Sequence, residues 1–178
     1  MDLIAFIDTE IDPNSGRILD IGCVKESGGS FHSGSVADFI RFLKGSKYVC
    51  GHNILNHDLK YIQNAIDDAG ISKFNVIDTL FFSPLMFPAR PYHALLKDDK
   101  LQTEDANNPL NDSMKAKDLF YDEVAAFQQT DPSLKRIYYF LLKDKTEFGA
   151  FFNFVKFEEN NINIETEICE MFHAQICE

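Results

Sequence analysis

The chain has 178 residues, 45% of them hydrophobic and 25% charged, and 17 basic against 28 acidic residues give a formal net charge of −11. This composition is typical of one globular domain with an appendage and excludes a disordered chain. No apolar run reaches the roughly 20 residues that cross a bilayer, so we expect no membrane partner. The charge also disfavours nucleic acid, unless carboxylates gather around cations that reverse the local sign.

Apolar runs and turn residues divide the N-terminal half into short elements. Continuous or alternating apolar patterns predict strands over 3–7, 17–25, a short stretch near 31, 48–53 and 74–80. Helical spacing predicts helices over 36–43 and 58–69, the second ending at Gly70. The first strands lie so close in sequence that we expect them to pair antiparallel.

The C-terminal half is predicted to be helical. Pro84, Pro88 and Pro91 interrupt the pattern, and 98–111 is a polar loop before a helix over 112–127. An aromatic-rich helical segment then starts at Pro132, breaks at Gly149 and is followed by a last helix. The order predicts an α/β protein, a mixed sheet flanked by helices. We expect a core over residues 1–127 and a helical extension over 128–178.

The cysteines and the first residues bear on the compartment. The four cysteines fit neither a zinc ribbon nor a disulfide framework, and Cys23 and Cys50 lie in apolar runs typical of buried free thiols. The N-terminal residues have no basic region or cleavage site of a secretory signal. We therefore expect a cytoplasmic protein.

The sequence Asp8-Thr9-Glu10 is the strongest local signal for chemistry. Residues two apart in a strand point to the same side, so the two acids would project together at the end of a buried strand. Two close carboxylates repel one another unless a hard cation such as Mg²⁺ or Mn²⁺ lies between them. The alternative is that Glu10 simply lies in solvent at the end of the strand.

Two further acids follow polar loops at the starts of helices. Asp58 comes after Gly51-His52-Asn53, and Asp112 opens the helix after the loop 98–111. Each has an ordinary alternative, because an acid in the first turn of a helix stabilises its backbone N–H groups. Asn53 can equally be a turn residue.

Together these motifs resemble the DEDD superfamily of 3′–5′ exonucleases, the family of the DNA polymerase proofreading subunit and RNase T. The match consists of IAFIDTE, GHN followed by HD, IDTL, and the helix N-x-L-N-D-S-M-x-A, in the family's order over residues 3 to about 127. The resemblance implies a ribonuclease-H-like fold with a mixed five-stranded sheet. It also implies a two-metal hydrolysis of phosphodiester bonds at free 3′ ends of DNA or RNA, with single-stranded DNA the expected partner.

Site residues are implied by the same resemblance, position by position. Asp8, Glu10, Asp58 and Asp112 would hold two Mg²⁺ or Mn²⁺ ions, and Thr9, Asn53 and Tyr92 would contact the substrate. Arg90, Lys97, Lys100, Lys115 and Lys117 flank the third motif and either contact phosphates or form a solvated basic face.

The chain departs from the family at the general base. Five residues before Asp112, where one subgroup has His, stands Asn107, and four before, where another has Tyr, stands Asn108. Three explanations remain: hydroxide formed at the metals suffices, with Asn107 orienting water; His93 acts as the base; or the domain binds 3′ ends without cutting. Losing a base costs about 10²–10⁴ in rate, so we expect Asn107→His to raise activity.

A second hypothesis from another class is a catalytically impaired 3′-end-binding module of a larger repair protein, fused to or docking with a helicase or polymerase. The sequence PYHALLKDDKL resembles exonuclease domains at the front of bacterial helicase-type repair proteins, and the aromatic density of the extension calls for a partner surface. A phosphatase built on a strand-end aspartate is a weaker third hypothesis, since D-T-E is not the usual D-x-D.

Overall fold

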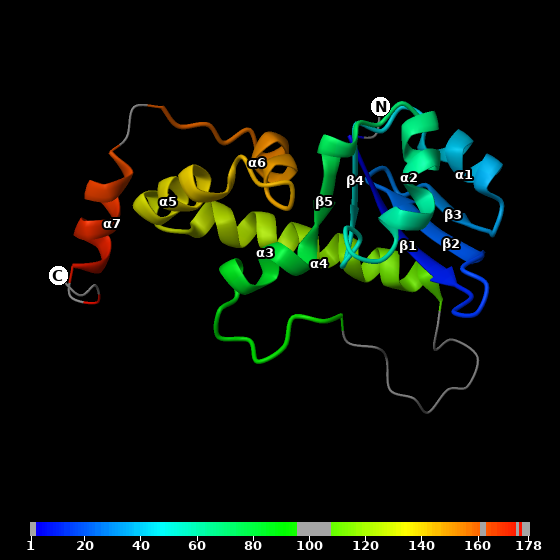
Figure 1. Cartoon of the computed structure of the whole chain (residues 1–178), viewed down its shortest axis with the longest axis horizontal. Helices are drawn as coiled ribbons and strands as arrows, with labels where there is room; N and C mark the ends of the chain where they lie inside the picture. Colours follow the sequence, from blue (N-terminus) through cyan, green and yellow to red (C-terminus); the bar gives the residue numbers. More distant parts are fainter. Residues whose placement is uncertain (1–2, 96–107, 161–162, 174, 176–178) are drawn as a thin grey trace.

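One five-stranded sheet organises the computed structural model, which describes residues 3–95, 108–160, 163–173 and 175 (Figure 1). Its strands are β1 (Ile4–Ile11), β2 (Ile18–Lys25), β3 (Ser30–His32), β4 (Tyr48–Gly51) and β5 (Val76–Asp78), in the order β3-β2-β1-β4-β5. β2 is antiparallel to β1 and β3, whereas β1, β4 and β5 run parallel. The predicted mixed sheet flanked by helices is confirmed.

Helices cover both faces of this sheet. α1 (Val36–Leu43) and α2 (Leu59–Asp68) pack on one face. The other face carries α3 (Thr79–Met86), the long α4 (Pro109–Gln129) and α6 (Gly149–Val155), with the short 3-10 turn η1 (Lys73–Asn75) leading into β5. α5 (Pro132–Leu142) and α7 (Ile164–Phe172) continue past the sheet along the axis of α4 (Figure 1). No helix within the described ranges is long and apolar enough to cross a bilayer.

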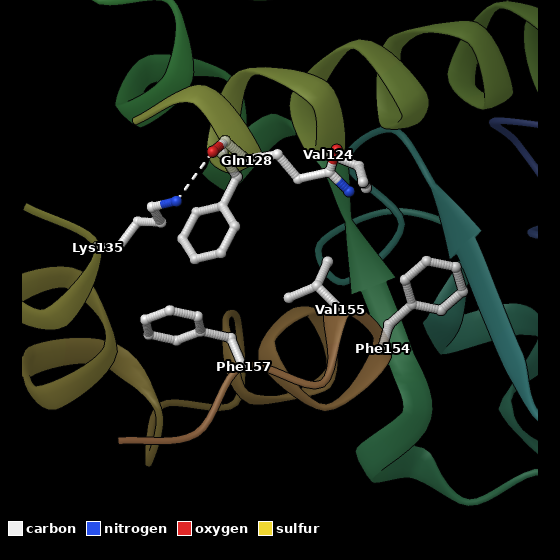
Figure 2. Close-up of a pocket in the computed structure, with 7 residues that line it drawn as sticks. Val124, Gln128, Lys135, Phe154, Val155 and Phe157 are labelled. Atoms are coloured by element: carbon white, nitrogen blue, oxygen red, sulfur yellow. Dashed lines mark hydrogen bonds between the residues drawn. The ribbon is translucent and has the colours of Figure 1, made fainter. Parts of the chain in front are cut away.

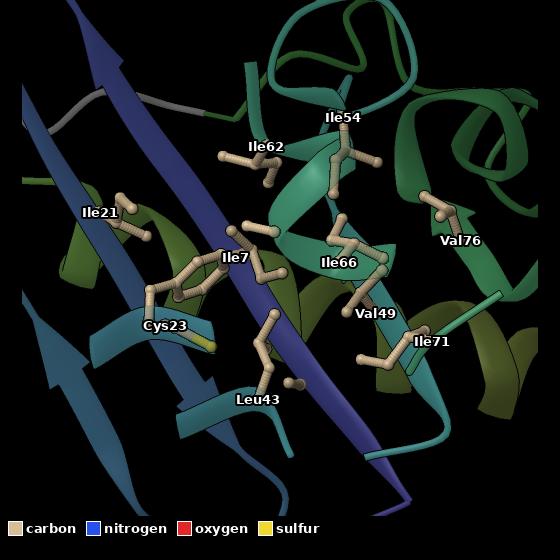
Figure 3. Packing of buried hydrophobic residues seen from close by; sticks show 13 residues of the cluster. Ile7, Ile21, Cys23, Leu43, Val49, Ile54, Ile62, Ile66, Ile71 and Val76 are labelled. Carbon is tan, nitrogen blue, oxygen red and sulfur yellow. The ribbon is translucent and has the colours of Figure 1, made fainter. Parts of the chain in front are cut away.

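The side chains of β1 point alternately to the two faces of the sheet and so contribute to two separate cores. Ala5 and Ile7 point into an aliphatic core under α1 and α2, where Ile21, Ile62 and Ile66 meet (Figure 3). Ile4 and Phe6 point into the opposite core, which is built largely from phenylalanine rings of α3, α4 and α6. Because successive side chains of a strand face opposite ways, a continuous apolar run fills both cores at once.

The aromatic core draws in the C-terminal helices. Phe151 of α6 stacks on Phe82 of α3 with ring centroids 4.0 Å apart, and it also meets the edge of Phe127 on α4 at 5.5 Å. Such ring pairs add about 0.5–1.5 kcal/mol to the free energy gained by burial. Part of the predicted extension, 128–178, is thus packed into the same core as α4, while the division at 127 stays a prediction.

Beyond α6 the packing is looser. A cavity of about 380 Å³ lies between α4, α5 and α6, and Lys135 crosses its edge to donate to the Gln128 carbonyl at 2.9 Å (Figure 2). α7 is joined to α5 by the pair Arg136–Glu167, 3.0 Å apart. α7 therefore packs on α5 and contributes no residue to the main core among the described residues.

Several element boundaries differ from the prediction. The strand predicted over 3–7 continues through Ile11, because the acids at its end keep pairing with β2. The strand predicted over 74–80 is cut short at Asp78, whose side chain caps α3 by accepting from the Leu80 N–H. α4 begins at Pro109 rather than 112, since Asn108 caps it and proline suits a first helical position.

The buried thiols are confirmed. Cys23 and Cys50 are free and buried, and burial raises the pKa of both. Cys169 is free and exposed. Cys177 lies outside the described residues.

Candidate functional site

A cavity of about 270 Å³ opens where β1 and β4 end and α2 and α4 begin. Its lining comes from three distant segments of the chain: Asp8, Thr9, Glu10, Ile11, His52, Asn53, His57, Asp58 and Asp112. We call it the acidic cavity. The four acids predicted from sequence motifs therefore lie around one space.

Asp8 and Glu10 reach the acidic cavity from within β1. In the register with β2, Asp8 lies opposite Gly22 and Glu10 opposite Asp20. Both acids share the face of β1 that carries Phe6, the face on which α4 packs. The strand thus presents two half-buried carboxylates to the first turn of α4.

Gly22 permits the close approach that brings Asp112 to Asp8. A Cβ atom built on Gly22 would lie 2.0 Å from the carbonyl carbon of Pro109, at the start of α4. Real side chains do not tolerate such contact with backbone, so only glycine allows the helix to begin here. Asp112 follows in the first turn, with Lys115 donating to its Oδ1 at 3.3 Å.

Asp58 enters from the other face of the sheet. It is 2% exposed and makes no side-chain cap bond to α2; instead its Oδ1 accepts the Thr9 N–H at 3.0 Å and the Thr9 hydroxyl at 2.5 Å. Burial raises the pKa of Asp58, and the Thr9 hydroxyl opposes that shift. The helix-cap alternative for Asp58 is therefore wrong. The Thr9 N–H, which donates to Asp58, is not available to the substrate that Thr9 is expected to contact.

The loop between β4 and α2 is held by a residue that the sequence analysis did not single out. Asp78, at the end of β5, is fully buried and accepts the N–H groups of Asn53 at 2.8 Å and Leu55 at 3.0 Å. Asn53 has a positive φ of 62°, which asparagine tolerates better than most residues. The only sequence signal for this role was the start of the Ile77-Asp78-Thr79-Leu80 motif.

Two histidines also line the acidic cavity. The His52 ring lies 2.8 Å from the Thr79 hydroxyl, and burial, with a smaller effect of the charge on His93, lowers its pKa to about 4. His52 is therefore neutral at neutral pH. His57 is about half exposed and its Nδ1 lies 3.8 Å from Asp58 Oδ1.

Two of the predicted site residues lie elsewhere. His93 and Tyr92 line a different cavity, where the His93 Nδ1 is 2.9 Å from the Ser83 hydroxyl. His93 therefore supplies no general base among the four acids. Asn107 lies outside the described residues.

The donor set of the acidic cavity fits a hard divalent cation, since its acidic side chains offer carboxylate oxygens. Within the described ranges, no three His, Cys, Asp or Glu side chains stand together closely enough to hold a metal ion. Asp8, Glu10 and Asp112 are only half-buried, so their carboxylates have room to turn towards a shared ion. The residues suit a metal centre because they are carboxylates that line one cavity. Their oxygens do not already lie at the distances of metal ligands.

Comparisons with protein-family models, curated proteins and solved structures found no match to this chain. The chemistry of the acidic cavity is accordingly argued from its geometry.

Proposed function

We propose that the chain is a metal-dependent 3′–5′ exonuclease with a ribonuclease-H-like fold, which hydrolyses phosphodiester bonds at free 3′ ends of DNA or RNA. The observation that carries this proposal is the meeting of Asp8, Glu10, Asp58 and Asp112 in one cavity. The strand order β3-β2-β1-β4-β5, with only β2 reversed against its neighbours, supports the fold. The resemblance of the sequence motifs to the DEDD superfamily supports the direction of attack.

Each acid has a defined part in this proposal. Asp8, Glu10, Asp58 and Asp112 would hold two Mg²⁺ or Mn²⁺ ions. When bound, the ions would make water a nucleophile near neutral pH and stabilise the leaving 3′ oxygen. Thr9 fixes Asp58 through two hydrogen bonds, so that this carboxylate stays oriented in a buried place.

The proposed enzyme is slow for its class. His93 lies in a different cavity, the Asn107 amide is not a base near neutral pH, and losing a general base costs about 10²–10⁴ in rate. His52 remains neutral at working pH, but its ring is engaged with Thr79. Water activation would therefore depend chiefly on the cations, and measurable cleavage would need high enzyme concentrations.

The test is incubation of a 5′-labelled single-stranded oligonucleotide with Mg²⁺ or Mn²⁺ and, separately, with EDTA. We expect a ladder shortened from the 3′ end that EDTA abolishes. Asp58→Asn and Asp112→Asn should remove the ladder, whereas Asp118→Asn, an exposed acid on the same helix, should not. A ladder that survives Asp112→Asn would overturn the assignment of the site.

A thermal-unfolding series provides a readout that does not depend on cutting. A ligand that binds the folded state raises the unfolding temperature with its concentration. We expect Mn²⁺ to do so for the unmodified chain and for Asp118→Asn, but not for Asp112→Asn. Oligonucleotide binding without shortening at any metal concentration would instead favour a 3′-end-binding module.

A further inference from the structure

A second cavity, of about 330 Å³, lies between the segment after α3 and the face of α4. We call it the cationic cavity. Its described lining consists of Ser83, Arg90, Tyr92, His93, Ala94, Leu95, Lys115 and Leu119. Two cationic side chains, Arg90 and Lys115, are among these residues, and Lys115 also pairs with Asp112. Positive charge gathered in a cavity attracts an anion.

The polar groups of the cationic cavity are held by neighbours. The Arg90 guanidinium lies over the Phe87 ring, 3.8 Å from its centroid, and its backbone N–H donates to the Phe87 carbonyl. The Nδ1 atom of His93 is engaged with Ser83, which leaves Nε2 as the ring nitrogen available to a ligand. Planar guanidinium and imidazole groups fixed in this way suit the oxygens of a phosphate.

Tyr92 adds an aromatic surface beside these cations. Its side chain is 82% exposed, the largest such value among the exposed large hydrophobic residues. An exposed ring next to basic groups is the arrangement on which single-stranded nucleic acids stack their bases. Bases within a duplex are already stacked on their neighbours, so an exposed ring of this kind favours an unpaired strand.

The cationic cavity adjoins the acidic cavity along α4. Asp112 belongs to the acidic cavity, and Lys115, one helical turn on, lines the cationic cavity while donating to Asp112 Oδ1 at 3.3 Å. Along α3, the His52 ring of the acidic cavity contacts Thr79, and the His93 ring contacts Ser83 one helical turn further on. A nucleic acid strand whose terminal phosphodiester bond lies at the acidic cavity would thus have a neighbouring nucleotide at the cationic cavity.

We propose that the cationic cavity holds a backbone phosphate of single-stranded nucleic acid, with Arg90 and His93 as donors and Tyr92 as the stacking surface for an adjacent base. This inference rests on the proposed function and deepens it. The substrate is then an unpaired polynucleotide gripped over at least two nucleotides, rather than a mononucleotide ester. Phosphate contacts of this kind set the position of the strand and are indifferent to its sequence.

The test is fluorescence anisotropy with a 5′-fluorescein-labelled thymidine dodecamer, measured in EDTA and again in Ca²⁺, with strand length checked afterwards. We expect Arg90→Ala to weaken binding about tenfold and to lower the slope of log affinity against log salt by about 0.7, the share of one phosphate contact. Tyr92→Ala, which removes an exposed ring and leaves the core untouched, should weaken binding about fivefold or more.

Matched controls separate the cationic cavity from general effects of charge and surface. Arg41→Ala removes an exposed arginine on α1, across the sheet, and Phe74→Ala removes an exposed ring near η1. Both should bind like the unmodified chain. Equal affinities for Arg90→Ala and Arg41→Ala, together with no loss for Tyr92→Ala, would overturn the inference, as would failure of the unmodified chain to bind the dodecamer.

Failure of this inference differs from failure of the proposed exonuclease. If cleavage requires Asp112 but Arg90→Ala binds the dodecamer normally, the exonuclease proposal stands and the inference about the cationic cavity is wrong. If binding requires Arg90 and Tyr92 but the oligonucleotide is not shortened at any Mn²⁺ concentration, the inference about the cationic cavity stands and the exonuclease proposal is wrong.

Discussion

The two ends of α4 place acids in opposite surroundings. Asp112, in the first turn, has a side chain 23% exposed, lines an open cavity and accepts from Lys115. Glu123, about three turns further on, is fully buried in the aromatic half of the molecule, and neither of its carboxylate oxygens has a hydrogen-bond partner among the described residues. One helix therefore carries a partly exposed carboxylate with a partner and a buried carboxylate without one among the described residues.

The difference lies in solvation. Burial raises the pKa of Glu123 to about 9, with a further contribution from the negative charge of Asp78 and a small opposing one from Arg90. Glu123 is accordingly protonated at neutral pH, because a charged carboxylate without partners is costly in an apolar core. The acids of the acidic cavity are half-buried or hydrogen-bonded, whereas Glu123, three turns along α4, is buried without a hydrogen-bond partner among the described residues.

The largest effect is expected from breaking the approach of α4 to the sheet. Gly22→Ala would set a Cβ atom 2.0 Å from the backbone at Pro109, so the first turn of α4 must move and carry Asp112 away from Asp8. We expect a loss of about 3 kcal/mol or more in the free energy of unfolding, measured with urea, since overpacking commonly costs 1–3 kcal/mol and backbone cannot yield as a side chain does.

Gly29→Ala is the matched control for that substitution. A Cβ atom there would meet its nearest neighbours at 3.9 Å, which is ordinary contact. Its stability and its rate of oligonucleotide shortening should stay close to those of the unmodified chain. Similar small losses for both glycines would mean that α4 does not depend on Gly22 for its position.

The second effect tests the buried end of α4. In the unfolded chain Glu123 has a pKa near 4.5, whereas in the folded chain it is about 9, so folding favours the protonated form. Stability from this group is therefore fully present below about pH 4.5 and falls as pH rises towards 9. Glu123→Gln removes the titration, and we expect it to stabilise the fold by roughly 2 to 3 kcal/mol at pH 7 and by almost nothing near pH 4.5.

Urea unfolding between pH 4.5 and 9 measures this difference. Asp122→Asn, which changes the neighbouring exposed acid on the same helix, is the control and should leave the pH dependence unaltered. Parallel pH profiles for Glu123→Gln and the unmodified chain would show that Glu123 is charged in the folded state, contrary to the comparison drawn above.

Residues whose role follows from local periodicity were predictable. The alternation of β1 placed Asp8 and Glu10 on one side, and the apolar run before them predicted a strand buried on both faces. The spacing of Asp58 and Asp112 at helix starts also located those acids, although α4 begins three residues earlier than predicted. Each of these features is set by neighbours within a few positions of the chain.

Features that depend on packing between distant segments were not predictable from the chain. Thr9 meets Asp58 across 49 positions, and Gly22 looks like any strand residue until α4 lies against it. On α4 the apolar Met114 is 43% exposed, whereas the acidic Glu123 is buried. Burial of an acid depends on which face of the helix the surrounding aromatic rings cover. The polarity of the residue itself predicts exposure instead.

The smallest effect concerns Asp78, which lies between the two regions because it braces the loop of the acidic cavity and also bears on Glu123. Asp78→Asn keeps the shape of the side chain but replaces one accepting oxygen by an NH₂ group. That group faces a backbone N–H, so the hydrogen bond from Asn53 or from Leu55 is lost. Hydrogen bonds to charged groups contribute roughly 1.5–3 kcal/mol, and the side-chain oxygen that remains keeps its own contacts, which reduces the loss. We expect a net cost of about 1–2 kcal/mol by urea unfolding.

Asp68→Asn, an exposed acid at the end of α2, provides the same change of charge without those contacts. Because Asn53 holds a positive φ only while its N–H is fixed, Asp78→Asn should also slow oligonucleotide shortening more than Asp68→Asn does. Above about pH 9, where Glu123 becomes charged, Asp78→Asn should cost less stability than at pH 7, because only there does it remove a repulsion between two carboxylates. An equal cost at both pH values would mean that the charge of Asp78 does not act on Glu123.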